Sequence, residues 1–267
     1  MGEYDLALGN DHYFAYLCQQ TVFICPFAAY WCRCDNSYPI YVQTEDKEEQ
    51  MMKKAMRFIE VIFDTAYLLT ALTIGIILLI KANGSSVYLL AGLMALILMI
   101  GDSFHLVPRI IKSLKSNNAK TEKYLGLGKQ IASLTMAVFY ILLWTIGVNI
   151  FGVANHLPYT IIIYVLFAIR IVLCLLPQNK WYASDQPISW AIYRNIPFFL
   201  QGMIVATLYF LNRNTSAYLS FIYIAIILSF AFYLPVVLLA NRYKMIGALM
   251  LPKTLSYVYM LVMFLLI

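Results

Sequence analysis

Acidic and basic side chains interrupt long apolar segments of this 267-residue sequence, where charge is costly. Glu60 and Asp64 are four residues apart, and Asp102, His105 and Arg109 follow an i, i+3, i+7 spacing. Both spacings place the side chains on one face of a helix. Carboxyl and imidazole groups serve as general acids and bases, and two carboxyl groups in different environments can divide these roles. The predicted catalytic residues are Asp102, His105, Asp64 and Glu60.

Basic and phenolic side chains form a second set in the same segments. Guanidinium and ammonium groups suit phosphate oxygens, so this set favours a phosphate-bearing ligand. The predicted ligand-binding residues are Arg109, Lys129, Arg170, Arg194, Lys253 and Tyr257. In the alternative interpretation the charges only neutralise one another and tie helices together. Asp102 would then pair with Arg109. In the same way, Asp64 would pair with Lys253.

Metal and nucleophile chemistry have little support in the sequence. Zinc sites commonly use three protein ligands with more than one His or Cys, whereas only three histidines exist, and His12 and His156 lie outside the apolar segments. Nucleophilic catalysis would need an activated residue, but Cys174 lies in an apolar run with no adjacent base, and no Gly-x-Ser-x-Gly motif occurs. We therefore predict neither a metal nor an organic cofactor.

Composition requires that these residues sit in a membrane. Hydrophobic residues make up 62% of the chain and charged residues 12%, against about 45–50% and 25% in soluble domains. About 20 apolar residues suffice for one helical span. We predict an all-α, polytopic bundle of about seven transmembrane helices. The predicted spans are Arg57–Ile80, Val87–Ile111, Leu125–Phe151, Tyr159–Leu176, Trp190–Leu211, Tyr218–Ala240 and Ala248–Ile267.

Basic residues concentrate in alternate connections, which predicts a cytoplasmic N-terminus and an outer C-terminus. With this topology, every span carries its polar residues in its inner half. We therefore predict a water-filled, charged cavity that faces the cytoplasm, in a protein of the cell membrane or an endomembrane. Basic residues such as Lys129 and Arg194 could instead contact lipid phosphates, but that would not explain Glu60, Asp64 and Asp102. The net charge of +6 then reflects topology and lipid contact, and no nucleic-acid motif is present.

The first 50 residues differ from the rest. They contain four of the five cysteines, at positions 18, 25, 32 and 34, without the paired spacing of a zinc site. We predict an N-terminal extension over residues 1–50 that lies at the membrane surface, with an eighth hydrophobic segment as the alternative. Residues 51–267 form the predicted transmembrane domain.

Three segments resemble the YhhN-like lysoplasmalogenase family. They are the apolar run ALILMIGDSFHLVP at Ala95–Pro108, the glycine-containing run at Gly126–Tyr140 and the tyrosine-rich run at Ser256–Val262. The resemblance covers about Arg57–Ile267. It implies hydrolysis of the vinyl ether bond of lysoplasmalogens to a fatty aldehyde and a glycerophospho headgroup.

Within this resemblance, Asp102 matches the first aspartate of the family and becomes the expected acid. The second family aspartate is missing, because Ser229 is followed by Phe230. Asp64 or Glu60 could replace it across the cavity. The family also usually has eight spans rather than seven. We therefore expect a hydrolase of a lysophospholipid-like ligand in contact with membrane lipids, with a non-enzymatic transporter or receptor as the alternative.

Overall fold

The computed structural model describes residues 39–114, 119–183, 186–239 and 244–267. Its contacts divide the chain into two units, Met1–Met56 and Arg57–Ile267. The second unit contains the helical bundle. The cysteines at positions 18, 25, 32 and 34, and the predicted membrane-surface extension that contains them, lie outside the described residues.

All regular structure in the described residues is helical, which confirms the predicted all-α class. Two short 3-10 helices, η2 (Pro177–Asn179) and η3 (Lys244–Leu249), lie in connections. The seven α-helices of the described chain are α3 (Pro39–Ala82), α4 (Ser86–Leu114), α5 (Ala119–Phe151), α6 (Leu157–Leu175), α7 (Ile188–Leu211), α8 (Ile222–Leu239) and α9 (Met250–Leu265).

Six helical segments of the described chain are long and apolar enough to cross a membrane, which places the protein in the multi-pass membrane class. They are Arg57–Ala82, Ser86–Ile111, Lys123–Phe151, Leu157–Leu175, Ile222–Leu239 and Ile246–Leu265. Helix α7, predicted as the fifth span, is not among them. It is 24 residues long, but Arg194, Asn195 and Gln201 lower its hydropathy.

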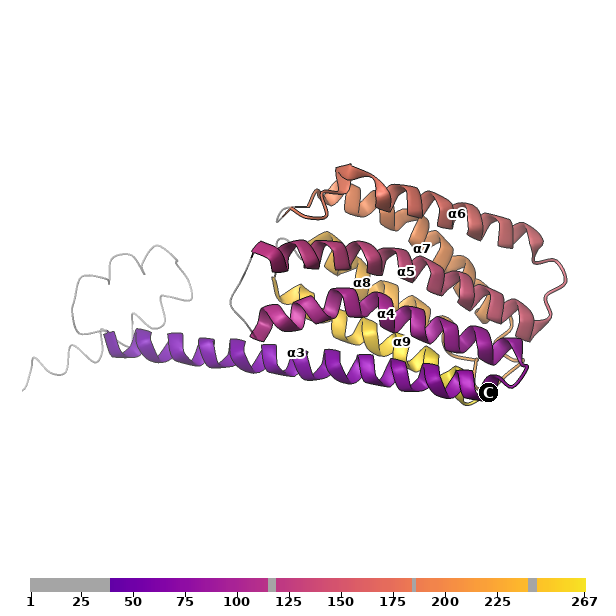
Figure 1. Ribbon diagram of the computed structural model, residues 1–267, viewed down its shortest axis with the longest axis horizontal. Helices are drawn as coiled ribbons and strands as arrows, with labels where there is room; N and C mark the ends of the chain where they lie inside the picture. The colour runs from indigo at the N-terminus through magenta and orange to yellow at the C-terminus, as the bar shows by residue number, and fades with distance from the viewer. Residues whose placement is uncertain (1–38, 115–118, 184–185, 240–243) are drawn as a thin grey trace, which may run out of the picture. The chain divides into compact units, whose positions relative to one another are not determined.

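Successive helices of the second unit run antiparallel, joined by short connections (Figure 1). Helix α7 packs against α5, α6 and α8, and buries Asn195 and Gln201 in these contacts. Polar side chains in such a position avoid lipid, which explains why a less apolar helix can lie within the bundle. Helix α9 packs between α4 and α8 and closes the arrangement.

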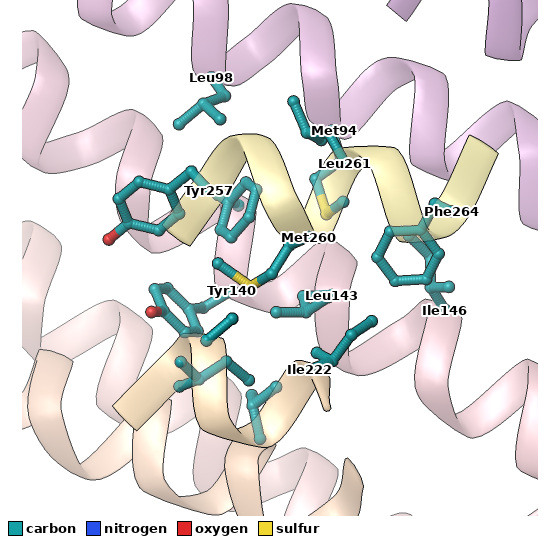
Figure 2. Close-up of a cluster of buried hydrophobic side chains, with 14 of the residues drawn as sticks. Met94, Leu98, Tyr140, Leu143, Ile146, Ile222, Tyr257, Met260, Leu261 and Phe264 are labelled. Atoms are coloured by element: carbon teal, nitrogen blue, oxygen red, sulfur yellow. The ribbon is translucent and has the colours of Figure 1, made fainter. Parts of the chain in front are cut away.

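One half of the bundle is packed with apolar and aromatic side chains (Figure 2). Leu143 of α5 and Met260 and Phe264 of α9 have almost no exposed surface. Tyr257 of α9 contacts Phe139 of α5 edge to face, with ring centroids 5.4 Å apart. Such packing holds helices together in a membrane, where hydrophobic transfer contributes little between spans.

Two glycines allow α4 and α5 to approach closely. A Cβ at Gly101 would collide with the side chain of Thr135, and one at Gly128 would collide with the carbonyl oxygen of Phe104. Small residues at helix contacts commonly have this role in membranes. A Cβ at Gly128 would also come within 2.8 Å of His105 Cα, so the absence of a side chain there sets the distance between α5 and the polar face of α4.

Candidate functional site

The second unit contains a pocket of about 270 Å³, formed by helix segments and by the connection between α6 and α7. Among the described residues, the C-terminal part of α4 and the N-terminal parts of α5 and α9 meet there. Its charged and polar lining side chains are Asp64, Asp102, His105, Arg109, Lys129, Ser133, Arg170, Gln186, Arg194, Tyr233, Lys253 and Thr254. The remainder of the lining is apolar or aromatic.

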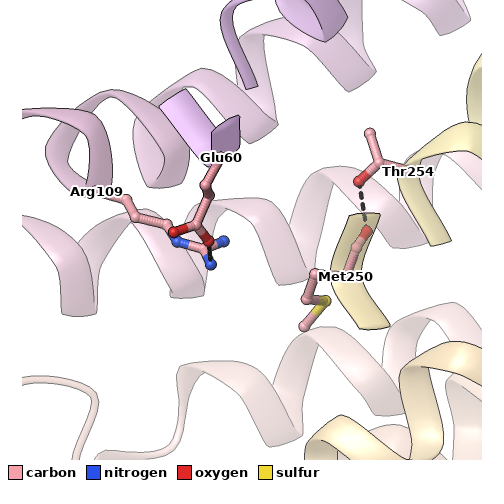
Figure 3. A network of polar contacts seen from close by, with 4 residues as sticks. All are labelled: Glu60, Arg109, Met250 and Thr254. Atoms are coloured by element: carbon pink, nitrogen blue, oxygen red, sulfur yellow. Dashed lines mark hydrogen bonds and ion pairs between the residues drawn. The ribbon is translucent and has the colours of Figure 1, made fainter. Parts of the chain in front are cut away.

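The pocket brings together eight of the ten residues selected from the sequence. These are Asp64, Asp102, His105, Arg109, Lys129, Arg170, Arg194 and Lys253. The two others do not line it. Glu60 forms an ion pair with Arg109 instead (Figure 3). Tyr257 is buried in the aromatic core, with its ring centroid 5.5 Å from Lys253 Nζ.

The carboxylates lie on α3 and α4. Asp102 Oδ2 accepts a hydrogen bond of 2.6 Å from the hydroxyl of Tyr67. Asp64 is 4% exposed, and its Oδ2 has no hydrogen-bond partner among the described residues. The Nδ1 atom of His105 is likewise buried and without a partner in the described chain. Each of these side chains therefore keeps hydrogen-bonding capacity for a ligand.

The two internal pairings considered from the sequence do not form. Arg109 contacts Glu60, so it is not the partner of Asp102. No ion pair joins Asp64 to Lys253, both of which belong to the described residues. Mutual neutralisation of these pairs therefore does not explain the buried carboxylates.

Aromatic rings contact three of the cations, and none of the three forms an ion pair with a carboxylate of the described chain. The guanidinium carbon of Arg170 lies 3.5 Å from the ring centroid of Phe198. Arg194 stacks over Trp181 at 4.1 Å, and Lys253 Nζ lies 4.4 Å from the ring centroid of Tyr233. Cation–π contacts favour the charged side chain without cancelling its charge for a ligand.

Four aromatic residues of the site were missed as site residues. Tyr67 lies three residues after Asp64 on the same helical face, so the i, i+3 spacing could have identified it. Phe198 has the appearance of an ordinary apolar residue of a span, and Tyr233 counts among the polar residues of the inner halves without being selected for the site. Trp181 belongs to the α6–α7 connection, where its indole donates to the Cys174 carbonyl over 2.9 Å. No sequence spacing indicates that contact.

The resulting arrangement suits an anion next to a carboxylate pair. Five basic side chains and two carboxylates line the pocket. No cluster of three or more His, Cys, Asp or Glu residues that could hold a metal occurs in the described chain. Ser229 is buried, lies 3.3 Å from the Tyr140 hydroxyl, and is followed by Phe230 rather than by a carboxylate. No protein-family model, curated protein or solved structure matches this chain.

Proposed function

We propose that the protein binds the headgroup of a lysophospholipid-like amphiphile in this pocket and hydrolyses its vinyl ether bond. The observation that carries the proposal is the joint presence of Asp64, Asp102 and an excess of basic side chains in one pocket. A cationic pocket selects a phosphate ester, and a pair of carboxyl groups can supply an acid and a base. The resemblance to the YhhN-like lysoplasmalogenases is the reason for proposing the vinyl ether bond as the bond that is cleaved.

The volume of the pocket indicates which part of the ligand it can hold. A volume of about 270 Å³ is at the lower limit for drug-sized ligands, so it admits a headgroup and the start of a chain rather than a whole lipid. The long alkenyl chain of the ligand would extend between helices into the hydrocarbon core of the bilayer. The positive-inside pattern of the connections supports a cytoplasmic orientation for the polar end of the bundle.

Formation of the hemiacetal needs two proton transfers. One carboxylic acid of the Asp64–Asp102 pair protonates the alkene carbon that is not bonded to the ether oxygen, giving an oxocarbenium ion. The other, as carboxylate, takes a proton from the water that attacks the carbon bonded to oxygen. The hemiacetal then collapses: its C–O bond to the glyceryl oxygen breaks, its hydroxyl proton passes by way of the pair to that leaving oxygen, and a fatty aldehyde and the free hydroxyl of the glycerophospho headgroup result. One water is consumed, and each proton given up by the pair is returned to it.

Fatty aldehyde release from lysoplasmalogen by the purified chain tests this proposal. We expect turnover by the wild type, and a loss of about 10³-fold in both Asp102→Asn and Asp64→Asn, the range typical of general acid–base residues. Ser103→Ala is the control, because Ser103 neighbours Asp102 but bonds only to the Ile100 carbonyl in the described chain. An inactive wild type, or an active Asp102→Asn variant, would reject hydrolysis.

Binding without chemistry is the second candidate, as in a transporter or receptor. It is favoured by the larger number of basic side chains than carboxylates in the pocket, and by Phe230 in place of the second aspartate that the YhhN-like resemblance leads one to expect. Counterflow uptake of radiolabelled lysophospholipid into proteoliposomes separates the two. Unchanged ligand recovered inside the vesicles favours transport, and aldehyde favours hydrolysis.

A further inference from the structure

Arg170 is the most deeply buried cation of the pocket, with 1% of its surface exposed. Its Nε donates to the carbonyl oxygen of Ser133 over 3.2 Å, and its guanidinium stacks on Phe198. Its Nη1 is buried and has no partner among the described residues. No carboxylate of the described chain forms an ion pair with it. A buried cation that lacks a counter-charge is strongly destabilising unless an anion compensates it.

Two further cations of the same pocket are held in a similar way. Arg194 donates from Nη1 to Asn179 Oδ1 over 2.9 Å and stacks on Trp181. Lys253 lies over the ring of Tyr233. Neither forms an ion pair with a carboxylate of the described chain. Neutral groups therefore fix the position of Arg194 and leave its positive charge available, whereas the charge of Lys253 also interacts with the nearby carboxylate of Asp102.

We propose that Arg170, Arg194 and Lys253 form a phosphate-binding subsite in which Arg170 Nη1 is the central donor. Three cations come from α6, α7 and α9, and even with Asp102 near Lys253 they bring more positive charge than the single charge of a carboxylate ligand would balance. Guanidinium groups also match the geometry of phosphate oxygens. The subsite rests on the proposed function, because it specifies which part of the amphiphile the pocket recognises. The carboxylates of α3 and α4 then face the reacting part of the same ligand.

Calorimetric titration of the full chain in uncharged detergent tests the subsite. The probes are inorganic phosphate, sn-glycerol 3-phosphate and, in mixed micelles, a lysophosphatidate. Tighter binding of the lysophosphatidate than of glycerol phosphate identifies a lipid headgroup as the source. Equal binding identifies a free phosphate ester. Both results support the subsite, whereas no heat of binding from any of the three phosphates overturns it.

Substitutions test whether phosphate binds at Arg170. We expect Arg170→Gln to weaken phosphate binding roughly tenfold or more, since a hydrogen bond to a charged group contributes about 1.5–3 kcal/mol. The matched control is Arg213→Gln. Arg213 also stacks on a phenylalanine, Phe210, and donates to a carbonyl, but it lies in the α7–α8 connection and does not line the pocket.

If Arg170→Gln elutes as an aggregate, Arg194→Gln, which is only part-buried, gives the decisive comparison. Wild-type affinity in a correctly eluting Arg170→Gln or Arg194→Gln variant would refute the subsite. Phosphate binding without aldehyde release would keep the subsite and reject hydrolysis. Aldehyde release by the Arg170→Gln variant with an unchanged KM would instead support hydrolysis and reject the subsite.

Discussion

The same helices build two different regions along their length. In one region, α4, α5 and α9 bury Leu98, Leu143 and Phe264 in close apolar contact. In the other region, the same three helices present Asp102, Lys129 and Lys253 to a pocket. The first region meets the ordinary requirements of a membrane bundle, with tight packing and no charge. The second region departs from these requirements, because it contains buried charged side chains.

From this difference we infer that the apolar region mainly stabilises the fold and that the pocket carries the proposed ligand binding and chemistry. Buried charges without full compensation lower stability, and proteins retain them where function requires them. Variants in the apolar region should therefore change the free energy of unfolding, and variants in the pocket should change binding or turnover. Three single substitutions and one double-mutant cycle test this division.

The largest loss of stability is expected from Phe264→Ala in the apolar region. Phe264 is 1% exposed and contacts neighbours from several helices. Its truncation leaves a cavity, and we expect a cost of about 3 kcal/mol in unfolding by SDS titration. Phe104→Ala is the control, because Phe104 is a helical residue of α4 with 48% exposure. Equal losses in the two variants would contradict a packed core.

Gly128→Ala should cost somewhat less, about 2 kcal/mol, by forcing α5 away from α4. The added Cβ would meet backbone atoms of Phe104, which cannot move aside as a flexible side chain would. Because the displacement also moves His105, binding of phosphate should weaken in parallel. Gly247→Ala is the matched control, since nothing lies within 4 Å of a Cβ there. Wild-type stability of Gly128→Ala would refute the close approach.

Asp64→Leu should act in the opposite direction and raise stability by about 1 kcal/mol. Replacing a buried charge with an apolar side chain of similar size is often neutral or stabilising, and Asp64 Oδ2 has no partner within the described chain. We expect the same variant to lose aldehyde release. A destabilised Asp64→Leu would show that Asp64 holds the bundle together, and the division into two regions would fail. SDS unfolding and aldehyde release are measured on one preparation.

The smallest effect is expected at the border of the pocket, from the ion pair between Glu60 and Arg109. Both side chains are about a quarter exposed, and exposed pairs typically contribute 0.2–1 kcal/mol. A double-mutant cycle with Glu60→Gln and Arg109→Gln should therefore give a coupling of about 0.5 kcal/mol. The coupling should fall in high salt. A coupling several times larger would mark this pair as part of the buried network.

The sequence was sufficient for the helices and for most of the pocket's charged residues. Apolar runs predicted the spans, and helical spacing placed Asp102, His105 and Arg109 on one face, where all three line the pocket. Glu60 and Tyr257 each share a helix face with a pocket residue but do not line the pocket. Glu60 is partly exposed beside Arg109, and Tyr257 is buried in the aromatic core. Helical periodicity indicates the face of a residue but not its position along the helix relative to a pocket.

Three-dimensional packing decided the remaining features of the site. The contact of Arg170 with Phe198 joins α6 to α7, and that of Arg194 with Trp181 joins α7 to the α6–α7 connection. Neither contact follows from spacing along one segment. The predicted fifth span shows the same limit, because α7 tolerates Asn195 and Gln201 only through neighbours that cover them.

The composition of α7 also has a consequence for how the chain is made. A span with Arg194, Asn195 and Gln201 partitions poorly into lipid by itself. Its neighbours α6 and α8 are among the most apolar segments of the described chain. During synthesis, α7 is therefore expected to enter the bilayer only together with one of them. Biogenesis of the bundle then depends on the pairing of helices within the translocon, before the pocket exists.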